Sequence, residues 1–317
     1  MKRIDLLIPT YNEEENVRPL VDNIIEVFKT VPKYDYRIVF IDNDSTDGTR
    51  NEIEAMIQEG KKVAAIYNAK NFGHIRSPFY GLTQCDGDAV VFMCADFQDP
   101  PEIIPQFIKE WEKGYKIVIG KKTKSEENKL MYFIRKCYYK GIKKIADVEH
   151  IEQFTGFGLY DKKFIEVLRD LDDSIPYLRG IVAELGFKRS EIEYNQHKRR
   201  YGKTKYNFYL LYDHAMLGIT SYSRILLRLC TMIGFVLAMI SFIIAIIYLI
   251  YKLLYWHLFT AGTAPILIGV FLFGSLQLFF IGLMGEYILN INTRVMHRPL
   301  VVEEKRLNFD TEKKGEE

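Results

Sequence analysis

The chain has few cysteines and histidines, and neither residue type shows the spacing of a metal site. The four cysteines lie far apart without a CxxC pair, and none of the six histidines has a second histidine four residues away. The sequence therefore indicates neither a disulfide framework nor a zinc site, and a reducing compartment fits best. GxGxxG and GxxxxGK[ST] are also missing, which argues against dinucleotide oxidoreductases and P-loop ATPases.

An excess of charge of one sign is equally lacking. Lys and Arg number 43 against 41 Asp and Glu, so the net charge is only +2 and gives no general case for nucleic acid as a partner. A polar "NEEEN" follows the start within a dozen residues, so we expect no signal peptide. With 317 residues, 48% of them hydrophobic, the chain can bury one large core or two smaller ones.

Long apolar runs are present only near the C-terminus, in residues 226–252 and 265–291. Each exceeds the ~20 apolar residues that cross a bilayer, and we expect two transmembrane helices; a pair of buried core helices is the alternative. The loop between them carries only Lys252 and His257 as basic residues. Four arginines flank the outer ends of the pair, which places both chain termini in the cytoplasm: Arg224, Arg228, Arg294 and Arg298.

The preceding part alternates short apolar runs with helical periodicity. The runs are brief and continuous, as strands buried on both faces should be, and they occupy residues 4–10, 37–42, 62–68, 88–96 and 116–120. Between the first two, Asn12 and Glu15 have the spacing of a capping pair at a helix start. The pattern predicts an α/β fold, with a mostly parallel sheet and helices on both faces.

Each predicted strand ends in polar residues, and such ends share one edge of a parallel sheet, where ligands bind. Tyr11 can cover a base and Asp42 can accept a hydrogen bond from a base N–H. Helix N-termini after Asn12 and Ser45 can donate to phosphates, and Asp96 can hold a divalent cation that bridges them. A turn followed by a helix cap is the alternative interpretation of "DNDSTDG".

"LIPTYNEEENV", "IDNDSTDGT", "NFGHIRSPFYGL", "ADFQDPPE" and "RRYGKTKY", followed by two apolar spans, resemble family 2 glycosyltransferases of the polyprenyl-phosphate type. These are similar to dolichyl-phosphate mannose and glucose synthases. The resemblance implies a GT-A fold and inverting transfer of a hexose, from a nucleotide sugar such as a UDP-sugar, to undecaprenyl phosphate. The product would be a lipid-linked sugar for cell-envelope glycans, made by a multi-pass protein of the cell membrane with a cytoplasmic catalytic domain.

The domain limits follow from this resemblance and from composition. We expect a GT-A domain in residues 1–205, an interfacial helix region in 206–225, two transmembrane helices within 226–292, and a partly disordered cytoplasmic tail in 293–317. A basic amphipathic segment in 129–145 either lies on the membrane surface or packs on the catalytic domain.

The resemblance also assigns residues to a donor site. The nucleotide-binding set is Pro9, Tyr11, Glu13, Asp42, Asp44, Asn71, Gly73, Ala95, Asp96 and Gln98. Asp96 and Gln98 would address Mg²⁺ or Mn²⁺ and the diphosphate, and one carboxylate can suffice because Mg²⁺ is often completed by substrate oxygens and water. Asp99 either helps through a water molecule or caps the helix that begins at "PPE".

The acceptor would be bound by basic residues. A lipid monophosphate is roughly nine-tenths dianion at neutral pH, so it can attack without losing a proton to a protein base. Its expected cationic cradle is Lys121, Lys122, Arg135, Arg199, Arg200, Lys203 and Lys205. The expected catalytic set is Asp96, Asp99, Arg199, Arg200 and Lys203.

Four positions depart from the family pattern. Asn43 and Asp44 stand where relatives commonly have Asp and Gly, and Gly156 stands where some carry an acid proposed as base. Cys94 replaces the first carboxylate of a D-x-D pair. Cysteine is a poor magnesium ligand, so we interpret Cys94 as a small buried strand residue.

Two other functions compete with the transferase hypothesis. These departures would also suit a catalytically weak scaffold that binds a nucleotide sugar at the membrane. A processive polysaccharide synthase would need more spans and a Q-x-x-R-W-type segment, and neither is found. The oligomeric state stays open. A homo-oligomer is one possibility, since small residues in the apolar runs can pack between chains: Gly234, Ala238, Gly269 and Gly274.

Overall fold

The computed structural model describes residues 1–123, most of 151–197, parts of 232–254, 263–296 and 298–309. The chain divides into two compact units. The larger unit is α/β, and it includes the residues from Met296 onward as well as the N-terminal part of the chain.

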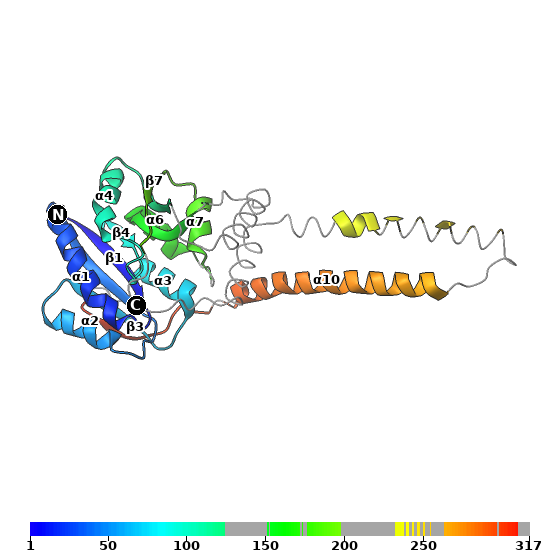
Figure 1. Ribbon diagram of the computed structural model, residues 1–317, viewed down its shortest axis with the longest axis horizontal. Helices are drawn as coiled ribbons and strands as arrows, with labels where there is room; N and C mark the ends of the chain where they lie inside the picture. Colours follow the sequence, from blue (N-terminus) through cyan, green and yellow to red (C-terminus); the bar gives the residue numbers. More distant parts are fainter. Residues whose placement is uncertain are drawn as a thin grey trace. The chain divides into compact units, whose positions relative to one another are not determined.

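The α/β unit alternates strands with helices along most of its length (Figure 1). Its elements are β1 (Lys2–Thr10), α1 (Glu14–Lys29), β2 (Tyr34–Asp42), α2 (Thr49–Gln58), β3 (Val63–Asn68), α3 (Gly73–Gln84), β4 (Ala89–Phe92), a 3₁₀ turn (Pro101–Ile103), α4 (Ile104–Glu112), β5 (Ile117–Lys122), β6 (Phe154–Asp161), α6 (Lys162–Asp170), α7 (Leu178–Glu184), β7 (Arg189–Tyr194) and β8 (Glu303–Leu307).

The strands form one sheet of order β7-β5-β6-β4-β1-β2-β3-β8. β1 pairs in parallel with β2 and β4, β2 with β3, and β5 with β7, whereas β6 and β8 run antiparallel to their neighbours. Because β6 is antiparallel to both β4 and β5, the C-terminal end of β5 lies at the same edge as those of β1 to β4. The predictions of a mostly parallel sheet and of a shared polar edge are confirmed.

Two hydrophobic layers cover the sheet, because successive side chains of each buried strand point to opposite faces. Leu6 and Phe40 belong to one layer and the neighbouring Leu7 and Ile41 to the other. Buried residues of α1, α2 and α4 complete the first layer, and those of α3, α6 and α7 complete the second. This three-layer arrangement fixes the strand ends from which the polar loops emerge.

The sheet ends in a strand that the sequence analysis does not foresee. Residues 303–307, placed in the predicted tail, form β8 and pair antiparallel with β3. Ala69 N donates to Val302 O at 3.0 Å, and Val301 is 6% exposed. The sequence "EEKRL" gives no sign of this strand because it has no buried hydrophobic pattern; β3 supplies the pairing partner, which the local sequence does not reveal.

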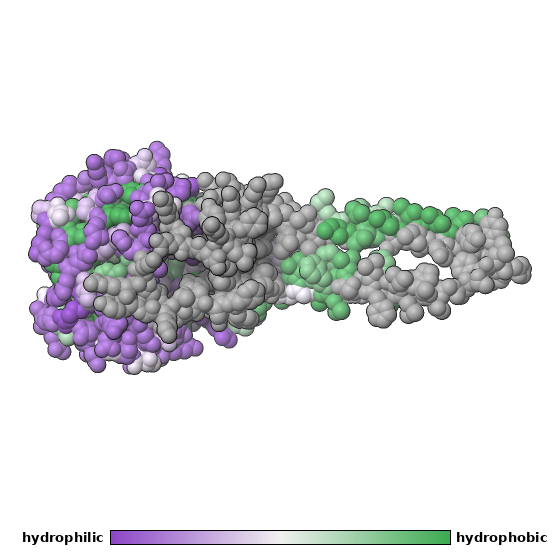
Figure 2. Space-filling view, in the orientation of Figure 1, coloured by the Kyte–Doolittle hydropathy of each residue, from purple (hydrophilic) through white to green (hydrophobic). Residues whose placement is uncertain are grey.

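The smaller unit contains α10 (Thr263–Val295), a helix of 33 residues. Many of its described hydrophobic side chains are exposed, among them Ile266, Val270 and Phe279. Figure 2 shows green, hydrophobic surface on this unit, in contrast to the mainly purple surface of the α/β unit. Over the residues that the structure describes, no helix is both long and apolar enough to cross a lipid bilayer. The predicted pair of transmembrane helices is not confirmed.

Candidate active site at the C-terminal edge of the sheet

The loops that leave the shared edge have unusual backbone conformations. Asn12, Asp44 and Phe97, which follow β1, β2 and β4, have φ values of 57°, 66° and 60°. Asn and Asp tolerate this left-handed region, but a bulky residue such as Phe adopts it only where the surroundings impose it. Strained residues of this kind cluster at functional sites. The φ of Asp44 is one that glycine adopts without strain.

The loops after β1 and β2 are joined by hydrogen bonds. Asn12 N donates to Ser45 Oγ at 2.9 Å, and Thr46 N donates to Asn12 Oδ1 at 2.8 Å. The predicted capping pair of Asn12 and Glu15 is therefore wrong: α1 begins at Glu14, and the residue before it makes no side-chain cap bond. Asn12 bonds the neighbouring loop instead of its own helix.

Further bonds extend this contact to the start of α2. Glu13 N donates to Thr49 Oγ1 at 2.9 Å, and Gly48 N donates to Glu14 Oε2 at 2.9 Å. α2 begins at Thr49, four residues after Ser45. Thr49 N donates to Asp47 Oδ1 at 3.0 Å. These hydrogen bonds join the loops after β1 and β2 into one wall at the edge of the sheet, made by residues 12–14 and 45–49.

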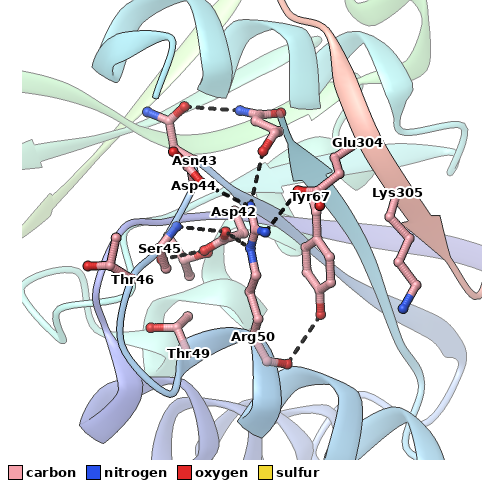
Figure 3. Close-up of polar contacts among 12 residues, drawn as sticks. Asp42, Asn43, Asp44, Ser45, Thr46, Thr49, Arg50, Tyr67, Glu304 and Lys305 are labelled. Carbon is pink, nitrogen blue, oxygen red and sulfur yellow. Dashed lines mark hydrogen bonds and ion pairs between the residues drawn. The ribbon is translucent and has the colours of Figure 1, made fainter. Parts of the chain in front are cut away.

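Asp42 supports this wall from inside (Figure 3). Its side chain is 0% exposed, and Oδ2 accepts from Ser45 N at 3.0 Å and from Arg50 Nε at 2.7 Å. The hydroxyls of Ser45 and Thr10 donate to Oδ1. The edge placement of Asp42 is as predicted, but both carboxylate oxygens bind protein groups. The predicted contact of Asp42 with a base stays a prediction.

Asn43 binds the loop that follows β3. Its Nδ2 donates to Asn71 Oδ1 at 2.8 Å and to Gly73 O at 3.2 Å. Its Oδ1 accepts from Asn68 Nδ2 at 3.0 Å and from Phe72 N at 2.9 Å. An aspartate cannot donate the first two bonds. The asparagine at position 43 therefore has a structural role in this chain. It holds two predicted nucleotide-site residues, Asn71 and Gly73, at the end of β2.

The turn after β4 contains the predicted metal residues. Asp96 is 4% exposed, and its Oδ1 accepts from Gln98 N at 3.2 Å across Phe97. In the described part of the chain, no group of three or more His, Cys, Asp or Glu side chains is placed to hold a metal ion. A buried carboxylate at this edge fits a divalent cation only if substrate oxygens and water complete its coordination.

Asp99 closes the same turn against β7. Its Oδ1 accepts from Tyr194 Oη at 2.7 Å, and its Oδ2 accepts from Cys94 N at 3.4 Å. Burial raises the pKa of Asp99 above its ordinary value, although the Tyr194 hydrogen bond opposes this in part. The predicted helix cap is wrong, since neither the 3₁₀ turn nor α4 has a side-chain cap bond. Asp99 is 3% exposed and braces the turn.

The two other departures have structural reasons. β4 ends at Phe92, so Cys94 lies beyond the strand and is half-buried; its interpretation as a buried strand residue is wrong. Gly156 has φ of 109°, and a Cβ there would lie 3.1 Å from the Phe92 ring. An acid at 156 would therefore be strained in this chain, whatever base relatives use.

The remaining predicted residues divide into those at the edge and those outside the described residues. Lys121 and Lys122 are the last residues of β5 instead of following it, and Lys121 Nζ lies 3.0 Å from Glu191 Oε2. Pro9, Tyr11 and Glu13 are half-buried at the end of β1 and in the loop after it, and Ala95 is buried beside Asp96. Several predicted residues or segments lie outside the described residues: Arg135, Arg199, Arg200, Lys203, Lys205, 129–145 and 206–225.

Arg50 and Glu304 are residues of this edge that the sequence analysis missed. Arg50 lies on the first turn of α2, eight residues after Asp42. An acid at the end of a buried strand, with an arginine on the next helix, was a usable signal for the Asp42–Arg50 pair. Nothing local pointed to Glu304, which lies 254 residues from Arg50 in the sequence.

The chain is similar in sequence to known proteins along nearly its whole length. The sequence model described as "Glycosyl transferase family 2" matches residues 5–186. Bactoprenol glucosyl transferase of Shigella phage SfV is 32% identical over 94% of this chain and 96% of its own length. The prophage bactoprenol glucosyl transferase homolog of Escherichia coli K12 is 30% identical over 94% and 97%.

A solved structure is also similar. Glucosyl-3-phosphoglycerate synthase from Mycobacterium tuberculosis, in complex with Mn²⁺, UDP and glucosyl-3-phosphoglycerate, is 16% identical. It aligns with a TM-score of 0.45 over 69% of this chain and 78% of that one.

Proposed function

Because the chain belongs to glycosyl transferase family 2 and has a GT-A-like α/β fold, we propose that this glycosyltransferase transfers a hexose, with glucose the first candidate, to polyprenyl phosphate. The observation that carries the proposal is the extent of the similarity to bactoprenol glucosyl transferases. It covers 94% of the chain and so extends well beyond residues 5–186, which the family match covers.

The donor would be a nucleotide sugar such as a UDP-sugar, bound at the C-terminal edge of β1, β2 and β4. This edge has a rigid wall, made by the bonded loops around Asn12 and Ser45, and a buried carboxylate at Asp96. A divalent cation held by Asp96, with help from Gln98 and the diphosphate oxygens, would neutralise charge on the leaving nucleoside diphosphate.

The reaction needs no proton transfer from the acceptor. A phosphate dianion oxygen attacks the anomeric carbon, the bond from that carbon to the diphosphate oxygen breaks, and the configuration inverts. Lys121 and Lys122, at the end of β5, are candidates to orient the acceptor phosphate. The basic segment from Arg199 to Lys205, outside the described residues, would complete this cradle.

We propose further that the protein is a multi-pass cell-membrane protein with its catalytic unit on the cytoplasmic face. The exposed apolar side chains of α10 support this, because an apolar surface of that kind is costly in water and favourable in lipid. The acceptor's lipid tail would then lie in the same membrane as the helix.

The test uses the purified full chain in detergent with radiolabelled nucleotide sugars, undecaprenyl phosphate, and Mg²⁺, Mn²⁺ or EDTA. We expect organic-phase radioactivity from one donor, dependent on the cation and greatly reduced in Asp96→Ala. Asp173→Ala, at a half-exposed loop position, is the matched control. Absence of product from every donor would contradict the transferase proposal, and full activity of Asp96→Ala would contradict the cation site.

A further inference from the structure

The C-terminal strand has a β-bulge beside the proposed donor site. Tyr67 of β3 pairs with Lys305 and the next residue, Asn68, pairs with Glu303, so Glu304 is the extra residue. A bulge changes the direction of a side chain and is frequent next to active sites. In Figure 3, Glu304 lies beside Arg50 of α2.

Arg50 connects the bulge to the end of β2. Its Nη1 donates to Glu304 Oε2 at 2.9 Å, and its Nε donates to Asp42 Oδ2 at 2.7 Å. Its Nη2 donates to Asn68 O at 3.0 Å, and the guanidinium carbon lies 5.0 Å from the centre of the Tyr67 ring. The guanidinium is therefore held by α2, β2, β3 and β8 together.

The three charged side chains of this network differ in how deeply they are buried. The Asp42 side chain is 0% exposed and that of Arg50 is 22% exposed, whereas that of Glu304 is 55% exposed. Burial alone would lower the pKa of Arg50, but hydrogen bonds and ion pairs with Asp42 and Glu304 raise it above the ordinary value. A buried carboxylate needs such a fixed cation, since an unpaired buried charge is strongly destabilising.

We propose that Glu304 and Arg50 are positioning residues of the donor site, through which the C-terminal strand β8 sets the affinity for the nucleoside diphosphate. Glu304 orients Arg50, and Arg50 holds Asp42 in the position from which it accepts from Ser45 N and Ser45 Oγ. Ser45 in turn binds the loop after β1 at Asn12. The inference rests on the proposed function, because it concerns the nucleotide part of the same site.

β8 has other anchors, so removing the Glu304 charge should leave the strand in place. Tyr80 Oη donates to Glu303 Oε1 at 2.8 Å, and Lys305 Nζ lies 3.1 Å from Glu54 Oε1. The Lys305–Glu54 pair also joins β8 to α2, but its side chains are 52% and 37% exposed and it does not touch Asp42. Glu54→Gln is therefore a matched control for Glu304→Gln.

The experiment measures UDP and GDP binding to the full chain in detergent by calorimetry, together with donor KM and kcat. We expect Glu304→Gln to raise the Kd for the preferred nucleotide, and the donor KM, by roughly fivefold with little change in kcat, as expected for coupled residues in one network. Glu54→Gln should leave both constants unchanged. Combining Glu304→Gln with Arg50→Met should raise Kd no further than Arg50→Met alone.

The outcomes separate the inference from the proposed function. If the unaltered chain binds neither UDP nor GDP, the proposed function fails and the inference with it. If the chain binds a nucleotide and Glu304→Gln binds it equally well, the inference alone is overturned. An equal rise in Kd for Glu54→Gln would also overturn it, because the effect would then come from general loosening of β8.

Discussion

The two sides of the sheet edge hold their buried carboxylates differently. On the β1–β2–β3 side, Asp42 faces the guanidinium of Arg50 at 2.7 Å. On the β4–β5–β7 side, Asp99 accepts from the Tyr194 hydroxyl and the Cys94 amide, both neutral donors. Arg50 places an opposite charge beside Asp42, whereas burial raises the pKa of Asp99 above its ordinary value although its hydrogen bond from Tyr194 opposes this. One side of the edge thus holds its buried carboxylate with a cation, and the other holds it with neutral donors.

The largest expected effect comes from removing the Arg50 guanidinium from the β1–β2–β3 side. Arg50→Met should lower the free energy of unfolding by about 3 kcal/mol, because Asp42 is left as an uncompensated buried charge. Chemical denaturation measures the change. Arg18→Met is the matched control: Arg18 also pairs with two carboxylates, Glu52 and Glu59, but at the surface, so it should cost less than about 1 kcal/mol. Equal effects would contradict the distinction.

The loop contacts of the same side are tested by Asn43→Asp. The substitution places a carboxylate against Asn71 Oδ1 and Gly73 O, where an amide donates now. We expect a loss of about 2 kcal/mol in unfolding free energy, since two donors disappear and acceptors face each other. Asn51→Asp makes the same change at an exposed position of α2 and should be nearly neutral. An unchanged stability in Asn43→Asp would mean that the loop after β3 does not depend on this amide.

On the other side, Cys94→Asp would supply the first carboxylate of a D-x-D pair with Asp96. If Asp96 binds the cation, the Kd for Mn²⁺ in the presence of UDP should fall about tenfold, or about 1.4 kcal/mol. Cys94→Ser controls for loss of the sulfur. A higher Kd in Cys94→Asp would show that residue 94 faces away from the cation.

The smallest expected effect concerns the pH dependence of Asp99. A raised folded-state pKa means that the favourable contribution of Asp99 is complete below its unfolded pKa and is lost as pH rises through the folded value. Asp99→Asn does not titrate, so its stability relative to the unaltered protein should rise between pH 4 and 7, by on the order of 1 kcal/mol. Unfolding at several pH values measures this, and a relative stability that falls over the interval would contradict the assignment.

Residues of the same short motifs differed in how well the sequence predicted them. Most of the apolar strand runs and their polar ends were predicted correctly, because a strand buried on both faces needs a continuous hydrophobic stretch, as in Val63–Asn68. The run 88–96 was predicted too long, since β4 ends at Phe92. The role of Asn12 was predicted wrongly, because its local spacing to Glu15 fits a cap equally well. Only contact with the loop of Ser45 and Thr46 decides between the two.

The sequence by itself determined the layer structure, the edge at which the polar residues gather, and the family of the chain, since these depend on hydrophobic pattern and motif order. The tertiary structure alone decided that Glu304 reaches Arg50, that Asp99 bonds Tyr194, and that Gly156 has a backbone conformation in which an acid would be strained. These contacts join residues far apart in the chain, and each depends on the direction of a side chain at a bulge, a turn or a strand end. A local pattern cannot encode a direction that the neighbouring strands impose.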